Sequence, residues 1–272
     1  MPTVPSTDEL ARDLQRVIQE RSHQFIFVDD GGAGHHDMGE DVLVQDHVTY
    51  TAIILKSQDV PLLNSAHEQW IELAKTDAPM VRELHGTEII NPKKDTPWFR
   101  VDMSRRAKML VIAAKSMLSC ISRVLHGHIG KAQYDFLVSP NNPAICKLPA
   151  HVQKSLQTHK GGLEHVFHVA LGRQVKATGV PTVIVQDEDQ YRECLKHQYA
   201  ADIPIWQGGI VYQPSYAWPG IQAADLFSMA LCRLFRIKFK NRTLQPLSPL
   251  DLACEEICHL LEGKLFDVLS DP

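Results

Sequence analysis

Four acidic residues stand where their carboxylates could act together, namely Asp29, Glu83, Asp187 and Asp225. Asp29 follows the apolar run 25–28, and Asp187 follows a second β-prone run. Such runs predict buried strands, and α/β enzymes often place chemistry where strands end. Asp29 also precedes a pair of glycines, however, and Asp before glycine is ordinary turn composition. On its own segment, Asp29 is therefore either a site residue or a turn residue.

Asp225 has the least ordinary setting of the four acids. It lies about one turn into an apolar helical pattern, with Ile221, Ala224, Leu226 and Met229 around it. A carboxylate on such a face is costly unless it is hydrogen-bonded, paired or bound to a metal. We therefore expect Asp225 to be either a metal ligand or a buried hydrogen-bond acceptor.

Oxygen-rich sites of this kind suit hard divalent cations. Mg²⁺ and Mn²⁺ prefer oxygen ligands, and two-metal phosphodiester chemistry brings several carboxylates together from different elements. The order of the acids, with strand ends first and a helix last, predicts a ribonuclease-H-like metal site. The spacing is not specific by itself, because a chain with 32 acidic residues offers many such quartets.

The hydrophobic pattern indicates which elements would position these acids. Strands alternate with amphipathic helices, which predicts an α/β fold with a mixed sheet flanked by helices and opened by three successive antiparallel strands. The expected strands are 25–28, a hairpin within 42–55, 134–138, 180–185 and 209–212. The expected helices are 7–20, 62–74, 103–126, 151–178 with an interruption at Gly161-Gly162, 188–199, 220–231 and 247–269.

Composition limits the classes of function. The chain has 272 residues, 44% of them hydrophobic, which fits a single domain over 1–272. A formal net charge of -4 indicates no basic tail, so nucleic-acid binding would need a local basic surface or metal ions. The chain offers no apolar run of about 18 residues, and its N-terminal pattern is amphipathic, unlike a signal peptide. We therefore expect a cytoplasmic protein without a membrane span.

Basic, cysteine and histidine residues suggest no second site. The predicted helix 103–126 carries Arg105, Arg106, Lys108, Lys115 and Arg123 on one face, which is either solvated or a surface for a polyanion. Cys254 and Cys258 are four apart on a helix, and we interpret them as buried thiols. The 14 histidines show no zinc-site spacing, and most are interpreted as surface or capping residues.

Four short motifs surround the acids in chain order. They are Val28-Asp29-Asp30-Gly31-Gly32, Glu83-Leu84-His85, Val185-Gln186-Asp187-Glu188 and Ile221-Gln222-Ala223-Ala224-Asp225-Leu226. In order and approximate spacing, these motifs resemble the prokaryotic family named domain of unknown function 3800 (DUF3800), which typically reads Y-I-D-E-S-G near its start and Q-x-A-D-L near its end. The resemblance covers roughly residues 24–236.

The resemblance implies a ribonuclease-H-like core with an N-terminal helix (7–20) and a C-terminal helix (247–269) added to it. It places the family's acidic positions on the four acids above, with His85 and Gln222 beside them and Asp30 in a supporting role. Asp30 stands where the family usually has Glu, and Gly31 where it usually has Ser.

The leading hypothesis is a nuclease or related phosphoryl-transfer enzyme that uses Mg²⁺ or Mn²⁺, with DNA or RNA as its substrate. In this hypothesis His85 is a proton shuttle or a ligand-orienting residue, and otherwise it is a capping or core histidine. The alternative is a nucleic-acid-binding or protein-interaction module that kept the fold and lost the reaction. The amphipathic C-terminal helix is a candidate homodimer contact.

Overall fold

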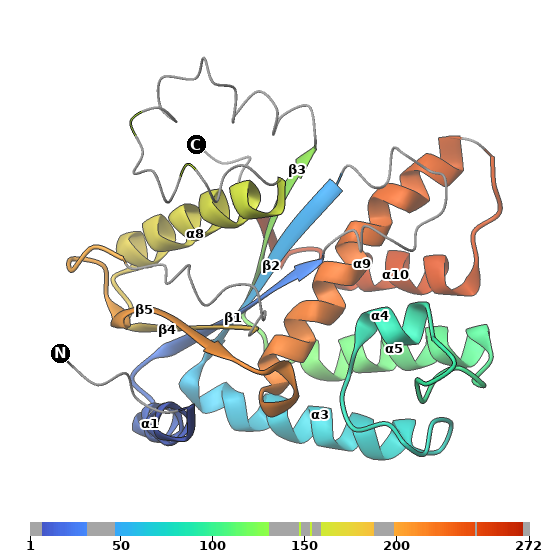
Figure 1. Cartoon of the computed structure of the whole chain (residues 1–272), viewed down its shortest axis with the longest axis horizontal. Coiled ribbons are helices and arrows are strands. Elements are labelled where there is room, and N and C mark those ends of the chain that lie inside the picture. Colours follow the sequence, from blue (N-terminus) through green and yellow to red (C-terminus); the bar gives the residue numbers. More distant parts are fainter. Residues whose placement is uncertain are drawn as a thin grey trace.

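A six-stranded mixed sheet forms the centre of the structure, a computed structural model that describes residues 7–31, 47–130, 159–187, 199–242 and 244–268, with the isolated residues 147 and 153. The strand order across the sheet is β5-β4-β1-β2-β3-β6 (Figure 1). The strands are β1 (Gln24–Gly31), β2 (His47–Lys56), β3 (Arg123–Gly130), β4 (Thr182–Asp187), β5 (Ile205–Gln213) and β6 (Leu265–Asp267).

The strand directions bring the ends of β1 and β4 to the same edge. β1, β2 and β3 are antiparallel in turn, whereas β4 runs parallel to β1 and β5 parallel to β4. The predicted α/β class, a mixed sheet flanked by helices, is confirmed. Because the carboxyl ends of parallel neighbours meet, residues that end β1 and β4 lie side by side.

Helices cover both faces of the sheet. One face packs against α1, α3, α5, α9 and α10, whereas α8 covers the other (Figure 1). Side chains alternate between faces along each strand. Phe25 and Phe27 of β1 therefore belong to the larger core, on the face that α9 covers, and Ile26 and Val28 belong to the core beneath α8. The helices are α1 (Thr7–Glu20), α3 (Val60–Ala74), α4 (Gly86–Ile90), α5 (Met103–Leu118), α8 (His159–Thr178), α9 (Pro219–Arg242) and α10 (Pro249–Leu260).

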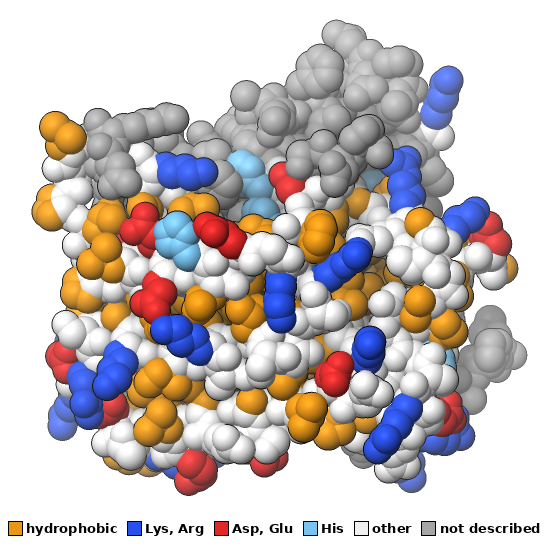
Figure 2. Space-filling view, turned by 180° about the vertical axis from the view of Figure 1, so that it is seen from behind, with side chains coloured by type: hydrophobic (Ala, Val, Ile, Leu, Met, Phe, Trp, Pro, Cys, Tyr) orange, Lys and Arg blue, Asp and Glu red, His pale blue; other side chains and the backbone are white. Residues whose placement is uncertain are grey.

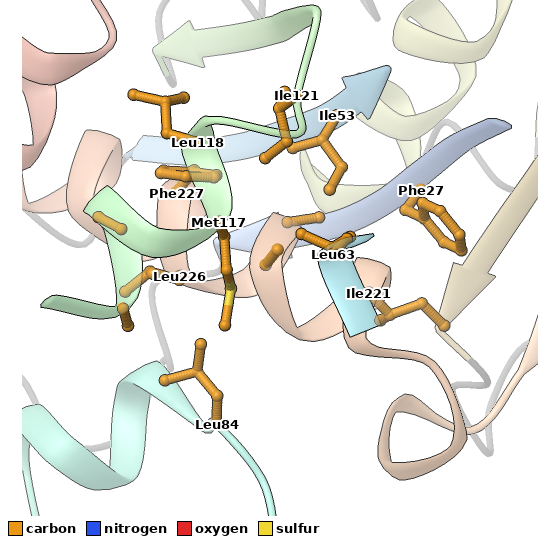
Figure 3. Close-up of a cluster of buried hydrophobic side chains, with 14 of the residues drawn as sticks. Phe27, Ile53, Leu63, Leu84, Met117, Leu118, Ile121, Ile221, Leu226 and Phe227 are labelled. Atoms are coloured by element: carbon orange, nitrogen blue, oxygen red, sulfur yellow. The ribbon is translucent and has the colours of Figure 1, made fainter. Parts of the chain in front are cut away.

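The larger core joins elements that are far apart in the sequence. Figure 3 shows Phe27 of β1 and Ile53 of β2 beside side chains from α3, α5 and α9. Phe27, Ile53 and Phe227 are fully buried. Burial of side chains of this size contributes about 1.5–3 kcal/mol each, so this core fixes α9 on the sheet.

One predicted helix is too long. The helix predicted over 103–126 ends at Leu118, and β3 begins at Arg123. Ile121 and Leu125 continue the helical spacing of apolar residues, although they belong to the turn and the strand. The third antiparallel strand is therefore β3, which follows the helices α3, α4 and α5, and the described part of 42–55 belongs to the single strand β2.

The C-terminal region also differs from the prediction. The helix predicted over 247–269 ends at Leu260, and β6 follows it and pairs with β3. The apolar face of α10, including Leu250, Cys254 and Ile257, is buried and packs against α5 and α9. That face is therefore used within the chain, which removes the reason for expecting a homodimer contact there.

Several predictions agree with the structure. The helices 7–20 and 62–74 correspond to α1 and α3, and the strands 180–185 and 209–212 correspond to β4 and β5. Gly161 and Gly162 lie inside α8, in its first turn, rather than at a break. The strand over 134–138 and nearly all of the helix over 188–199 lie outside the described residues. None of the described helices is long and apolar enough to cross a membrane.

Gly220 allows α9 to approach β1 closely. A Cβ atom at this position would overlap ring carbons of Phe27. The Phe27 ring is fully buried and also packs against Trp218, with 6.0 Å between ring centroids. The ring therefore has little room to move away.

We expect Gly220→Ala to destabilise the fold by about 1–3 kcal/mol, as overpacking of a filled core does. Chemical denaturation of wild type and variant measures the loss. Leu252→Ala is the control because Leu252 is 52% exposed on α10. A Gly220→Ala variant as stable as wild type would show that the helix moves aside without cost.

Candidate active site

Asp29 and Asp187 occupy neighbouring positions on parallel strands. Val28 of β1 is paired with Gln186 of β4, so the next residue on each strand is one of the two acids. Asp29 lies two residues after Phe27 on β1, and Asp187 lies two residues after Val185 on β4. The side chains of Phe27 and Val185 both face the larger core. Strand alternation therefore places both side chains on the face that α9 covers.

Asp225 adds a third carboxylate from α9. Asp29 is only 9% exposed, and burial is the main cause that raises its pKa well above the usual value. The next causes are the negative charges of Asp225, Asp30 and Asp187, in that order. Like charges shift a pKa in this way only at short range. The charges of Asp187 and Asp225 therefore both act on the Asp29 carboxyl group.

Asp225 is also held by the segment before α4. Its Oδ2 accepts a hydrogen bond of 2.9 Å from the Gly86 backbone N–H and lies 3.4 Å from Nδ1 of His85. The hydrogen bond with Asp225 raises the pKa of His85 to about 9, against the lowering effect of burial. His85 is therefore a cation at neutral pH, and its side chain is 48% exposed at the rim of the acidic cluster.

Glu83 occupies a different position from the other three acids. Burial lowers the pKa of His67, and the charge of Glu83 only partly offsets this. Glu83 is also a minor cause of the raised pKa of His85, and it is not among the charges that shift the pKa of Asp29. Glu83 is half-buried, two residues before His85. The structure therefore places Glu83 beside the histidine side of the site.

Gln222 anchors the segment that carries Glu83 and His85. Its Oε1 accepts a 2.6 Å hydrogen bond from the Leu84 backbone N–H and lies 2.7 Å from Nε2 of His67. Its Nε2 donates to the Ser215 carbonyl at 2.9 Å. Because Oε1 is an acceptor, Nε2 of His67 must be the donor. Gln222 is 2% exposed, so it acts by fixing the segment from within.

Arg106 holds the far end of α4. Its Nη1 donates to the carbonyls of Ile89 and Ile90 at 2.6 and 2.9 Å, and its Nε donates to the Val101 carbonyl at 3.1 Å. The side chain is 8% exposed. Arg106 was predicted on a basic surface, but it is an internal clamp on the last carbonyls of a short helix, which are otherwise unpaired.

The other basic residues of α5 do not form a continuous cationic surface. Arg105 pairs with Asp77, and Lys115 pairs with Glu256. On the described part of the face in Figure 2, Lys and Arg side chains are interspersed with acidic and apolar ones. The predicted polyanion surface on this helix is therefore largely neutralised by its neighbours.

Asp30 differs from its predicted place in the site. It pairs with Tyr50 across the β1–β2 ladder, and Tyr50 belongs to the core beneath α8. Strand alternation therefore directs the Asp30 side chain to the face opposite Asp29. Its backbone N–H donates a 2.8 Å hydrogen bond to Oδ1 of Asp29. Asp30 thus contacts Asp29 through its backbone, and its negative charge also raises the pKa of Asp29.

The sequence interpretation missed several buried polar residues. His67, His126 and His168 are at most 8% exposed, although most histidines were expected at the surface. Cys254 is fully buried as expected, and burial raises the pKa of its thiol to about 12. The helical spacing in α3 placed His67 on the buried stripe with Leu63 and Trp70, and that signal could have identified it.

The donor chemistry of the cluster suits Mg²⁺ or Mn²⁺, which take carboxylate oxygens. The like charges that raise the Asp29 pKa are those that a cation would offset. Within the described ranges, however, no three His, Cys, Asp or Glu side chains are arranged to hold a metal ion. Binding would therefore require some side chains to move, and Asp225, now in contact with His85, is the first of these.

Comparison with known proteins gives a fold likeness alone. No protein-family model and no curated protein sequence matches the chain. The solved structure of a glutamine-to-alanine mutant of Bst-RNase HIII is similar with 12% identity and a TM-score of 0.41, over 89% of this chain and 64% of that one. Bst-RNase HIII in complex with Mn²⁺ is similar with 12% identity and a TM-score of 0.42, over 95% and 68%. The chain thus spans about two thirds of these proteins' length.

The His85–Asp225 pair predicts a pH dependence of stability. Because folding raises the pKa of His85 from 6.5 to about 9, the pair stabilises the fold fully below pH 6.5 and loses this effect as pH rises through about 9. His85→Gln should therefore lower the unfolding midpoint at low pH and have little effect above pH 9. Thermal unfolding across this range measures the difference.

His259→Gln is the matched control for that experiment, since the ring of His259 pairs with Glu262 on the exposed surface. Ring-proton NMR of His85 gives an independent reading. Titration of His85 at or below 6.5 would contradict the assignment.

Gln222→Leu is expected to destabilise the fold by about 2 kcal/mol or more, because it leaves the donors of Leu84 and His67 buried without an acceptor. Denaturant unfolding measures the loss. Gln69→Leu on the exposed face of α3 is the control, with a change within about 0.5 kcal/mol. Equal effects of the two substitutions would refute the anchoring role.

Proposed function

We propose that the chain is a divalent-metal-dependent phosphodiester hydrolase that cleaves nucleic acid. One observation carries the proposal: Asp29 and Asp187 lie at the neighbouring ends of β1 and β4, and Asp225 of α9 is near enough for its charge to raise the pKa of Asp29. Carboxylates from separate elements that converge in this way are the usual protein ligands of catalytic Mg²⁺ or Mn²⁺. The fold likeness to ribonuclease HIII agrees with the proposal without carrying it.

Each residue of the cluster has a proposed role. Asp29, Asp187 and Asp225 would hold the cation, which would lower the pKa of a bound water and offset charge on the phosphate. Glu83 would contribute its carboxylate from the segment beside His85. Gln222 and the Asp30 backbone keep the segment around Glu83 and the Asp29 carboxylate in place.

His85 is the proposed proton donor to the leaving oxygen. Without the cation it is protonated at neutral pH, half exposed and in contact with Asp225 through Nδ1. When Asp225 turns to the cation, His85 would be released to face the substrate. A cation at the rim also attracts phosphate, which matters in a chain whose formal net charge is -4. In this role His85 binds the phosphodiester and donates its proton to the leaving oxygen.

A second candidate function is a nucleic-acid-binding module without hydrolysis. The observation that favours it is the engagement of Asp225, whose Oδ2 already receives Gly86 and contacts His85. In that state the carboxylate is a structural acceptor. The two functions differ in whether cleavage depends on the cation and on these acids.

We expect the purified protein to cleave DNA or RNA in the presence of Mn²⁺ or Mg²⁺ and to lose activity with a chelator. Asp29→Asn and Asp187→Asn should each reduce the rate by about 100-fold or more, because each removes a charge that the proposed cation requires. Cleavage of labelled single- and double-stranded DNA and RNA measures this.

Asp202→Asn is the control, since Asp202 is an exposed carboxylate paired with Lys176 away from the site. Unfolding midpoints of all variants show that they fold. Binding of the same nucleic acids without cleavage would favour the non-hydrolytic module. Full activity in both cluster variants would exclude the proposed site.

A further inference from the structure

A row of polar side chains crosses the acid-bearing face of the sheet. Asp29 of β1 lies directly opposite Thr51 of β2, and Thr51 lies directly opposite His126 of β3. Asp267 of β6 continues the row beside His126. Thr51 is two residues from Ile53, and His126 is two residues from Val124, so each pair lies on the same face of the sheet. Ile53 and Val124 belong to the larger core, and the row therefore shares the face of Asp29.

Thr51 and His126 have buried polar atoms that the described residues do not satisfy. Thr51 is 0% exposed and His126 is 8% exposed. Neither Oγ1 of Thr51 nor Nδ1 of His126 has a hydrogen-bond partner in the described part of the chain. An unsatisfied buried group of this kind costs about 1–3 kcal/mol, and native proteins rarely leave two of them adjacent.

The ring of His126 is neutral at physiological pH. Burial lowers its pKa to about 4, although the charge of Asp267 and the Tyr50 backbone act in the opposite direction. Each nitrogen of a neutral ring is either a donor or an acceptor, and a threonine hydroxyl can be both. A ligand that donates and accepts would therefore satisfy both atoms, and a charged ligand is not required.

The space between two side chains that lie directly opposite on neighbouring strands suits a single bridging water molecule. Side chains directly opposite on antiparallel strands have Cβ atoms about 4.5–5.5 Å apart. Thr51 and His126 are such a pair and do not bond to each other directly. Buried water typically makes about three hydrogen bonds to otherwise unsatisfied polar groups.

We propose that Thr51 and His126 bind one internal water molecule, which bridges Oγ1 and Nδ1 between β2 and β3. The bridge joins the two strands directly beside Asp29, so it supports the floor of the acidic cluster. It does not depend on the proposed hydrolase activity.

Thr51→Val and His126→Phe, singly and together, test the bridge through unfolding midpoints. If water bridges the two residues, each single variant lowers the midpoint, because it leaves the water and the other residue without a partner. The double variant then loses less than the sum of the two, because both polar partners are gone. If the site is dry, removing an unsatisfied hydroxyl leaves the midpoint unchanged or raised.

Thr49→Val is the matched control on the same strand and face, since its hydroxyl lies 3.3 Å from Oγ of Ser228. We expect its effect to add to that of His126→Phe. A crystal structure of the wild-type chain gives the direct reading, with a water within about 3.2 Å of both atoms. Additive effects of Thr51→Val and His126→Phe, or a dry contact in the crystal, would overturn the proposal.

Discussion

Repulsion among carboxylates on one face of the sheet is the constraint around which the rest of the site is arranged. Asp29 is buried and lies near three other acids, and each of these conditions disfavours its charged form. Backbone geometry holds the acids in place. The β1–β4 register fixes Asp29 beside Asp187, and the close approach of α9 to β1 at Gly220 brings Asp225 near Asp29. Acids whose pKa values are raised by burial and by neighbouring like charges are found most often at functional sites.

The support of the cluster extends into the segment around α4. Asp225 receives the Gly86 backbone N–H at one end of this helix, and Arg106 binds its last carbonyls at the other. Gln222 holds Leu84 just before it. These contacts place His85 at the rim of the cluster as a cation. The geometry of the site therefore depends on buried polar residues that do not themselves touch the acids, and their loss is expected to affect the site as well as stability.

The sequence predicted the fold class and the elements that end in acids, because these depend on local hydrophobic period and strand propensity. It failed where the local pattern was ambiguous. Ile121 and Leu125 continue the helical spacing of α5, and only pairing with β2 shows that Leu125 is in a strand. Strand alternation could have placed Asp30 opposite Asp29 from the sequence alone. The pairing of Thr51 with His126 and of His67 with Gln222 could not have been predicted, since the two residues of each pair are more than 70 positions apart in the chain.

Anomalous diffraction from crystals soaked in Mn²⁺ tests the central claim most directly. Mn²⁺ scatters anomalously, so its position does not depend on any assumption about ligands. The account predicts a peak at the shared edge of β1 and β4, within about 2–2.5 Å of carboxylate oxygens of Asp29 and Asp187, with Asp225 as a further ligand. A fully soaked crystal with no peak there, or a peak bound elsewhere while His85 keeps its contact with Asp225, would contradict it.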